Sequence, residues 1–241
     1  LMSHLGRPKG KPSPEFSLAP CAKALEKLLG VPVQMAPDCV GSDVDALAKV
    51  LKAGQVLLLE NLRFHKGEEK PDEEPLFASQ LAALGDVYVN DAFGTAHRAH
   101  ASTFTVPHHF QGAAAAGLLM QKELAFFEPL LFRPKRPFYA IIGGAKISSK
   151  IGVLKALLKK VDALLIGGAM AYTFLKAQGV SIGDSLYEEE WIPTAKKIIE
   201  EAERAKVKLF LPIDNVVADK ISADAISRVV TIEEGIPSGF S

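Results

Sequence analysis

Three polar loops in the first half of the chain each follow an apolar run and each combine arginine with histidine. In an open parallel sheet, ligands bind beyond the carboxyl ends of the strands. If these strands are neighbours, Arg7, Arg63 and Arg98 converge on one rim of the sheet. Planar guanidinium groups suit carboxylate and phosphate oxygens better than lysine does. The pattern therefore predicts a pocket for a small acid. The loops are Ser3–Arg7, Asn61–His65 and Thr95–His100.

An alternative is that these arginines are solvated or paired with Glu60, Asp86 and Asp91. For any single arginine this reading is about as favoured as a binding role. The recurrence of the same chemistry after three strands favours the pocket. Among the histidines, His4 and His97 are the candidates, and no His-Glu-x-x-His spacing suggests a metal. The histidines expected to be solvated or structural are His65, His108 and His109.

In the second half, glycines separate apolar runs from helix-like segments. Gly143-Gly144-Ala145-Lys146 is the first such turn, and Gly167-Gly168 is the second. Backbone N–H groups at a strand-to-helix turn can receive phosphate oxygens. Lys146 and Lys150 are four residues apart, so we expect both on one face of the first turns of a helix. The spacing is neither a Walker A loop nor a G-x-G-x-x-G fingerprint. Close helix-to-strand packing explains the glycines equally well.

The elements that must position these loops alternate between strand and helix. Ser17 and Gly30 are predicted to bound a helix whose apolar face contains Leu18, Cys21, Leu25, Leu28 and Leu29. A second helix begins at Ser42, with Asp45 completing an acidic capping box, and ends at Gly54. This alternation predicts an α/β fold with parallel sheets. The other predicted strands are 31–36, 55–59, 86–90, 138–142, 163–166, 208–211 and 216–218, and the other helices end at Leu84 or span 117–133 and 188–205.

A chain of 241 residues can form two medium-sized domains. The basic, proline-rich stretch Arg133–Pro137 suits a junction. We predict an N-terminal domain over 1–116, a junction over 117–134 and a C-terminal domain over 135–241. Both are expected to be doubly wound, Rossmann-like domains that face a cleft. The apolar start at Leu1 and the turn-like end at Ser241 suggest that both domains are truncated.

Composition narrows the function classes. Lys plus Arg and Asp plus Glu each number 28, so no net charge attracts nucleic acid or an acidic membrane. Cys21 and Cys39 fit neither a disulfide framework nor a zinc motif, which favours the reducing cytoplasm. The uncharged run Ala163–Leu175 is interrupted by glycines and is shorter than the roughly 20 residues of a membrane span.

Five motifs together resemble phosphoglycerate kinase, in order and over essentially the whole chain. The resemblance implies a two-lobed, monomeric glycolytic enzyme that reversibly transfers a phosphoryl group from 1,3-bisphosphoglycerate to Mg-ADP, giving 3-phosphoglycerate and ATP. The motifs are Ser3-His-Leu-Gly-Arg-Pro8, Leu58-Leu-Glu-Asn-Leu-Arg-Phe-His65, Val89-Asn-Asp-Ala-Phe-Gly-Thr-Ala-His-Arg-Ala-His100, Gly143-Gly-Ala-Lys146 and Met170-Ala-Tyr-Thr-Phe174.

The resemblance also implies roles for individual residues. Lys146 and Arg98 would be catalytic, with Lys146 stabilising the phosphoryl group in transfer. Such a transfer needs alignment and positive charge rather than a covalent intermediate. The residues implied to hold phosphoglycerate are His4, Leu5, Gly6, Arg7, Arg63 and Arg98, and those implied to bind nucleotide are Gly144, Ala145, Lys150, Gly168 and Ala169.

The sequence departs from the family pattern in places. Ala169 replaces a common third glycine, and Ser149 replaces a common acidic residue. The family's Asp-x-Asn strand and the arginine loop after it would precede Leu1. Its Gly-Gly-Gly-Asp loop, with the ligand for Mg2+, would follow Ser241. We therefore expect negligible turnover from this chain alone. A non-catalytic anion- or nucleotide-binding module is the alternative.

Overall fold

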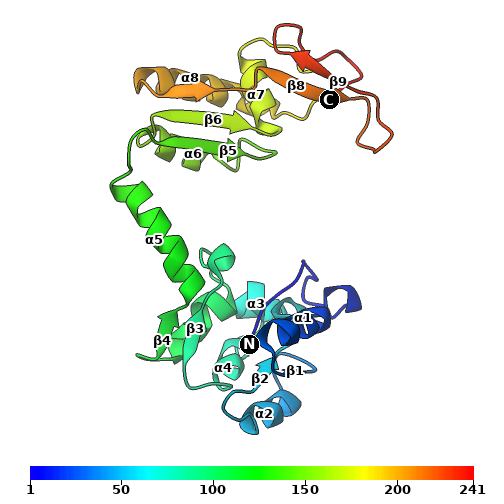
Figure 1. Cartoon of the computed structure of the whole chain (residues 1–241), viewed down its shortest axis with the longest axis vertical. Coiled ribbons are helices and arrows are strands. Elements are labelled where there is room, and N and C mark those ends of the chain that lie inside the picture. Colours follow the sequence, from blue (N-terminus) through cyan, green and yellow to red (C-terminus); the bar gives the residue numbers. More distant parts are fainter. The chain divides into compact units, whose positions relative to one another are not determined.

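The computed structural model describes all 241 residues as a mixed α/β chain. It divides into two compact units, Leu1–Phe126 and Phe127–Ser241, coloured blue to green and green to red in Figure 1. The division falls inside helix α5 (Leu118–Phe132). The domain limits at residues 116 and 134 stay predictions. No helix of the chain is both long and apolar enough to cross a membrane.

The first unit contains two pairs of parallel strands. Strand β1 (Val33–Met35) pairs with β2 (Val56–Leu58), and β3 (Tyr88–Asn90) pairs with β4 (Ala114–Ala116). Leu1 lies beside β2, accepting a hydrogen bond from the N–H of Leu59. The parallel α/β prediction is confirmed, although the sequence did not predict β4. The helices of this unit are α1 (Ala19–Leu29), α2 (Ser42–Lys49), α3 (Lys66–Glu69) and α4 (Phe77–Ala82), and its shorter helical turns are Pro14–Phe16, Leu62–Phe64, Pro71–Glu73, Phe93–Thr95, Ala101–Thr105 and Val106–His109.

Helix α1 buries a narrower face than predicted. Leu18 and Ala22 are buried and Leu25 packs against them, a stripe at spacings of four and three residues. Cys21 is exposed, and Leu28 and Leu29 are 83% and 49% exposed, so the predicted place of these three residues in the apolar face is wrong. The physical reason is that α1 packs on the short strands β1 and β2, which offer too little apolar surface to cover a wider stripe.

The predicted ends of α1 and α2 are partly correct. Gly30 ends α1 in a left-handed conformation with φ of 68°, as expected. Helix α1 starts at Ala19, and Glu60 accepts hydrogen bonds from Ser17 Oγ and the Leu18 N–H at its start. Helix α2 has no side-chain cap and ends at Lys49, so the predicted capping box and the end at Gly54 are wrong. Gly54 instead lies in the turn before β2, with φ of 82°.

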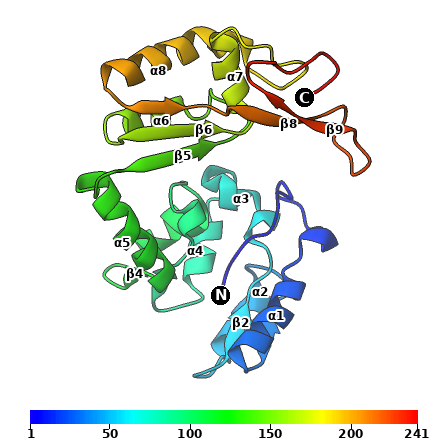
Figure 2. The ribbon, with the colours of Figure 1, turned by 45° about the horizontal axis from the view of Figure 1, so that its top comes forward.

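The second unit is built on a parallel sheet in the order β5 (Tyr139–Gly143), β6 (Ala163–Gly167) and β7 (Lys208–Phe210). Helices α6 (Ile151–Leu158), α7 (Met170–Ala177) and α8 (Ile192–Arg204) pack their apolar faces into the same core as β6. An antiparallel pair, β8 (Asp214–Ala218) and β9 (Ser227–Thr231), follows, and β9 was not predicted. Figure 2 shows the C-terminus beside this pair, where Ser241 exchanges hydrogen bonds with Ala218. A short helical turn, Glu189–Trp191, precedes α8.

Candidate functional site

Asn61 joins two of the three predicted loops of the first unit. It is fully buried. Its Nδ2 donates to the carbonyls of Leu5 and Phe16, at 2.8 and 2.9 Å. Its Oδ1 accepts from the N–H of Arg63 at 3.0 Å. Since one buried amide satisfies three backbone groups, the loop after β2 fixes the loop near the N-terminus. Asn61 is a positioning residue that the sequence motif contained but that residue-by-residue reasoning passed over.

Arg63 is held from several sides. Its side chain is 7% exposed, and its Nε lies 3.4 Å from Glu69 Oε1 without a hydrogen bond. Its Nη1 donates to the carbonyl of Gly6 at 2.8 Å. Gly6 has φ of 62°, and a Cβ there would lie 2.4 Å from the ring of Phe16. Glycine is therefore required at the position in the loop to which Arg63 donates its hydrogen bond.

Four cationic or titratable groups lie within electrostatic range of one another: His4, Arg63, Arg98 and His100. Burial lowers the pKa of His4, and the charges of Arg63, His100 and Arg98 lower it further, while Glu69 acts in the opposite direction. Burial also lowers the pKa of His100, where the glutamates of α3 act in the opposite direction and the two arginines act in the same one. A concentration of like charge with depressed histidine pKa values is typical of a site for an anion.

A buried polar network supports this cluster. Glu68 is 2% exposed and accepts from both the N–H and the Oγ of Ser102, at 3.0 and 2.7 Å. Its Oε1 lies 3.7 Å from His100 Nδ1. The hydroxyl of Tyr88 donates to the Ser102 carbonyl at 2.7 Å, and burial followed by the charge of Glu68 raises the pKa of Tyr88 to about 12. The network ties α3 to the loop that carries Arg98.

The predicted convergence of three arginines is only partly seen. Arg63 and Arg98 act on the same histidines, whereas Arg7 is exposed and is not among the charges that shift either pKa. His97 is exposed, and His100 takes the place beside the arginines. Ala101, next to His100, is fully buried. A small residue at that position is the sequence signal that the loop returns to the core.

The alternative pairing of these arginines with Glu60, Asp86 or Asp91 is not observed. Glu60 accepts from the start of α1, and Asp91 accepts from the N–H of Met120. Arg63 instead lies beside Glu69, which the sequence reasoning did not consider.

In the second unit, two glycine turns touch backbone to backbone. Gly143 lies opposite Gly167 in the register of β5 and β6. Gly168 has φ of 70°, and a Cβ there would lie 2.9 Å from both the N and the O of Gly144. The N–H of Met170 donates to the Gly144 carbonyl at 2.9 Å. Close packing therefore accounts for Gly168, and the same turns leave bare backbone at the carboxyl ends of β5 and β6.

The two lysines do not share the first turns of a helix, so that prediction is wrong. Helix α6 begins at Ile151, which leaves Lys146 in the loop and Lys150 at the N-cap. The segment between the two lysines is held in place before the helix begins. Ile147 is fully buried, and its carbonyl accepts a hydrogen bond from the Lys150 N–H at 2.8 Å. The Cε of Lys150 nevertheless lies 3.7 Å from the position of a Cβ on Gly144, so its side chain extends along the first glycine turn.

Glu188 holds the same loop. Its carboxylate accepts from the N–H and Oγ of Ser148, at 2.9 and 2.7 Å. Although burial acts to raise its pKa, these hydrogen bonds, one from Ile147 and the charge of Lys146 lower it overall. Lys146 is thus an exposed cation near an ionised carboxylate.

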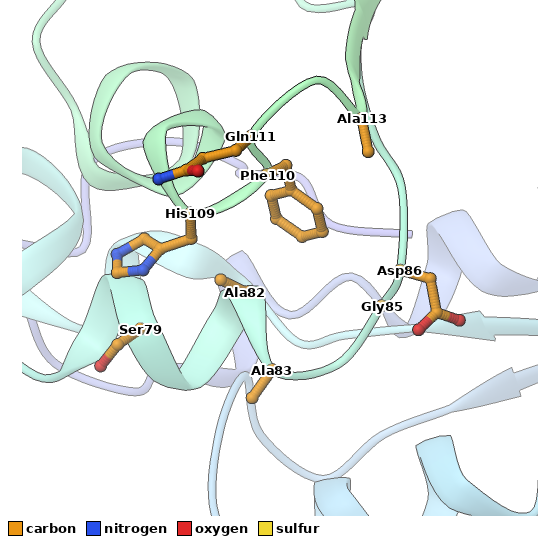
Figure 3. Close-up of a pocket in the computed structure, with 9 residues that line it drawn as sticks. All are labelled: Ser79, Ala82, Ala83, Gly85, Asp86, His109, Phe110, Gln111 and Ala113. Atoms are coloured by element: carbon orange, nitrogen blue, oxygen red, sulfur yellow. The ribbon is translucent and has the colours of Figure 1, made fainter.

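A cavity of about 460 Å³ in the first unit lies elsewhere. Figure 3 shows residues from α4 and from the segment His109–Gln111 around it. Gly85 and Asp86 precede β3, and Ala113 precedes β4. The cavity is therefore at the amino ends of these strands, opposite the end where ligands of parallel sheets bind. We do not assign it to the site.

A cation cluster and bare glycine turns at strand carboxyl ends are typical of α/β proteins that bind phosphorylated ligands. The family model for phosphoglycerate kinase matches residues 1–240. The chain belongs to the phosphoglycerate kinase family, which confirms the resemblance seen in its motifs.

Related proteins agree with this assignment. The chain is 57% identical over 233 residues to phosphoglycerate kinase of Chloroherpeton thalassium, covering 97% of this chain and 58% of that protein. It is 54% identical over 243 residues to that of Chlamydia muridarum, covering 100% and 60%. The solved phosphoglycerate kinase of Coxiella burnetii matches with a TM-score of 0.73 and 43% identity, over 100% of this chain and 59% of that one. The chain thus spans about 60% of the length of the curated relatives.

Proposed function

We propose that this chain carries the phosphoglycerate-binding and nucleotide-binding residues of an enzyme that transfers a phosphoryl group reversibly from 1,3-bisphosphoglycerate to Mg-ADP, giving 3-phosphoglycerate and ATP in glycolysis. The observation that carries the proposal is the cluster of His4, Arg63, Arg98 and His100 at the strand ends of the first unit. Family membership supports the reaction. No observation favours a non-catalytic module instead.

In the acid-binding half, the proposed roles follow from exposure and charge. Arg98 is half-buried and its charge lowers the pKa of both His4 and His100, so it suits the carboxylate or phosphate of the ligand. Arg63 is more deeply buried and partly used on Gly6, which makes it both a ligand contact and a loop anchor. The exposed Arg7, with His4 and the backbone of Leu5 and Gly6, would complete the binding loop.

In the second unit, both backbone groups and lysine side chains are proposed to bind the nucleotide. The turns containing Gly144, Ala145, Gly168 and Ala169 present bare backbone for the base and phosphates. Lys150 extends beside Gly144 and suits the phosphate chain. Lys146, exposed in the loop, would stabilise charge on the transferring phosphoryl group.

Mg2+ would enter with the nucleotide, shielding the phosphate charge. The carboxylate beside the first glycine turn is Glu188, and both of its oxygens accept from Ser148. It therefore holds the loop and does not fit a metal ligand. We assign no residue of this chain to Mg2+. The proposed partners are the phosphoglycerates and ADP or ATP, without nucleic acid or membrane, which the balanced charge of the chain supports. The proposed state is a monomer in the cytoplasm, where the two free cysteines would stay reduced.

Titration calorimetry of the chain with 3-phosphoglycerate and with ADP tests the proposal. We expect both ligands to bind. Arg98→Ala should lower the affinity for 3-phosphoglycerate by at least about tenfold, since a charge-assisted hydrogen bond contributes about 1.5–3 kcal/mol. Lys150→Ala should lower the affinity for ADP and leave the affinity for 3-phosphoglycerate unchanged. Arg133→Ala, an exposed arginine after α5, is the matched control.

Two outcomes would refute the assignment of the two sites. One is unchanged affinity for both ligands in these variants, and the other is that the folded wild-type chain binds neither ligand. A coupled ATP assay addresses turnover separately. We expect negligible turnover from the 241-residue chain, which spans about 60% of its relatives. Activity near that of an intact enzyme would contradict that expectation.

A further inference from the structure

A second group of reactive side chains lies in the first unit, apart from the cation cluster. The potential ligand atoms of Asp38, Cys39 and His65 all lie within 4.8 Å of one another. Asp38 and Cys39 follow β1, and His65 follows the helical turn after β2. His65 is not among the groups that shift the pKa of His4 or His100. The proposed phosphoryl-transfer chemistry does not use any of the three.

The three donors differ in exposure. Asp38 Oδ1 lies 2.7 Å from His65 Nε2, with the aspartate side chain 51% exposed and the imidazole 21% exposed. Cys39 is fully buried, and its Sγ donates to the Glu60 carbonyl at 3.0 Å. An ion could thus approach from the side of Asp38 and meet a buried sulfur beyond it.

Contacts with Glu74 and Phe77 hold the imidazole of His65 on its other side. His65 Nδ1 lies 3.4 Å from Glu74 Oε2. The ring stacks on Phe77 of α4, with centroids 4.7 Å apart and planes inclined by 17°. Histidines that bind metals almost always donate their second ring N–H to a carboxylate or carbonyl, which fixes the tautomer and the ring orientation. Glu74 stands where such a partner is needed, because it leaves Nε2 free to bind an ion.

We propose that Asp38, Cys39 and His65 form a binding site for a divalent transition metal, with Zn2+ as the best match. The combination of imidazole nitrogen, thiolate sulfur and carboxylate oxygen is a set that Zn2+ prefers, with water as a fourth ligand on the exposed side. Zinc bonds of about 2.0–2.3 Å place ligand atoms less than about 4 Å apart. The donors that are farthest apart, at up to 4.8 Å, must therefore approach each other by at least about 0.8 Å.

Binding changes a small number of bonds. The S–H bond of Cys39 breaks, its proton passes to solvent, and the sulfur lone pair forms the bond to the ion. The proton between His65 Nε2 and Asp38 Oδ1 leaves this contact as the ring takes the tautomer with its N–H on Nδ1, toward Glu74. The freed lone pair of Nε2 and the Oδ1 atom then each form a bond to the ion. No oxidation or reduction is involved. Burial raises the pKa of the Cys39 thiol, so this proton release is the main cost that the ion must offset.

Titration of the reduced, metal-free chain with Co2+, a spectroscopic substitute for Zn2+, tests the site. We expect one equivalent to give tetrahedral d–d bands and a thiolate-to-cobalt charge-transfer band, both removed by added Zn2+. Cys39→Ser should abolish the charge-transfer band. Cys21→Ser is the matched control, because Cys21 is the other free cysteine and is exposed on α1. Absence of the band in the folded wild-type chain, or its survival in Cys39→Ser, would overturn the proposal.

Two further variants keep the test decisive if Cys39→Ser does not fold. Asp38→Asn removes a half-exposed ligand, and Glu74→Gln removes the carboxylate behind the imidazole. Glu74→Gln should lower Co2+ affinity by about 10- to 100-fold, the range found for partners of metal ligands. Asp38→Asn, which removes a proposed ligand, should lower it at least as much. Affinity unchanged by both substitutions would exclude these residues from any metal site. These results are independent of whether the chain binds phosphoglycerate or ADP.

Discussion

The proposed acid-binding site of the first unit and the proposed nucleotide-binding site of the second unit differ in the groups that form them. In the first unit, side chains carry the site, and a buried polar network sets their positions through Asn61 and Glu68. In the second unit, backbone carries most of it, because Gly144 and Gly168 touch directly. The first half should therefore be sensitive to removal of buried polar groups. The second should be sensitive to addition of a single methyl group.

This difference also affects how each half can respond to ligand. A cluster of like charges is unfavourable until an anion arrives, so the first unit gains most from its ligand. Hydrogen-bonded glycine turns are already in place, so the second unit needs little rearrangement. Substitutions that separate these two behaviours sharpen the comparison.

The largest effect is expected for Glu68→Ala in the first unit. The substitution leaves the N–H and hydroxyl of Ser102 without an acceptor in a buried place. Each buried donor left without an acceptor typically costs about 1–3 kcal/mol of unfolding free energy, and two are left here. Chemical denaturation followed by circular dichroism measures the change. Glu73→Ala removes an exposed glutamate that pairs only with Lys70, and we expect little change. Equal effects from the two would contradict a network-supported site.

The next largest effect is expected for Gly168→Ala in the second unit. The new Cβ would adopt φ of 70° and lie 2.9 Å from backbone atoms of Gly144, which cannot move aside as a side chain can. We expect a loss of about 2–3 kcal/mol in unfolding free energy, from left-handed strain and the clash together. ADP binding should fall while 3-phosphoglycerate binding is retained.

Gly152→Ala is the matched control for this methyl group. Gly152 lies in α6 with nothing within 4 Å of an added Cβ, so alanine there should stabilise the helix by up to about 1 kcal/mol. If Gly168→Ala behaved like Gly152→Ala, the close approach of the two turns would not matter in solution.

The sequence predicted the elements better than the contacts within the site. Strand ends and glycine turns follow from local patterns, so the loops that carry Arg63 and Lys146 were located correctly. The buried His100 lies beside Glu68, a residue 32 positions away, and periodicity within one loop does not reveal such a partner. The α6 start was misplaced for a similar reason, because Glu188 holds the preceding loop from a distance in the chain. Long-range polar contacts set the details that local pattern leaves open.

The smallest effect, and the one most specific to the first unit, is a dependence on pH. Burial and neighbouring arginines lower the pKa values of His4 and His100, so the folded chain binds these protons less tightly than the unfolded chain does. Unfolding therefore takes up protons, and the free energy of unfolding should fall as pH drops through about 6.5, the ordinary histidine pKa, and level off above it.

An anion in the cluster reverses this preference, because its negative charge stabilises the protonated imidazoles. Binding of 3-phosphoglycerate should then take up protons near pH 6.5, which calorimetry detects as heats that differ between buffers of different ionisation enthalpy. His100→Gln should reduce the uptake. His109→Gln, an exposed histidine outside the cluster, should leave it unchanged. Because nothing comparable titrates in the glycine turns, ADP binding should show no such buffer dependence from the protein, and equal uptake for both ligands would remove the distinction between the two halves.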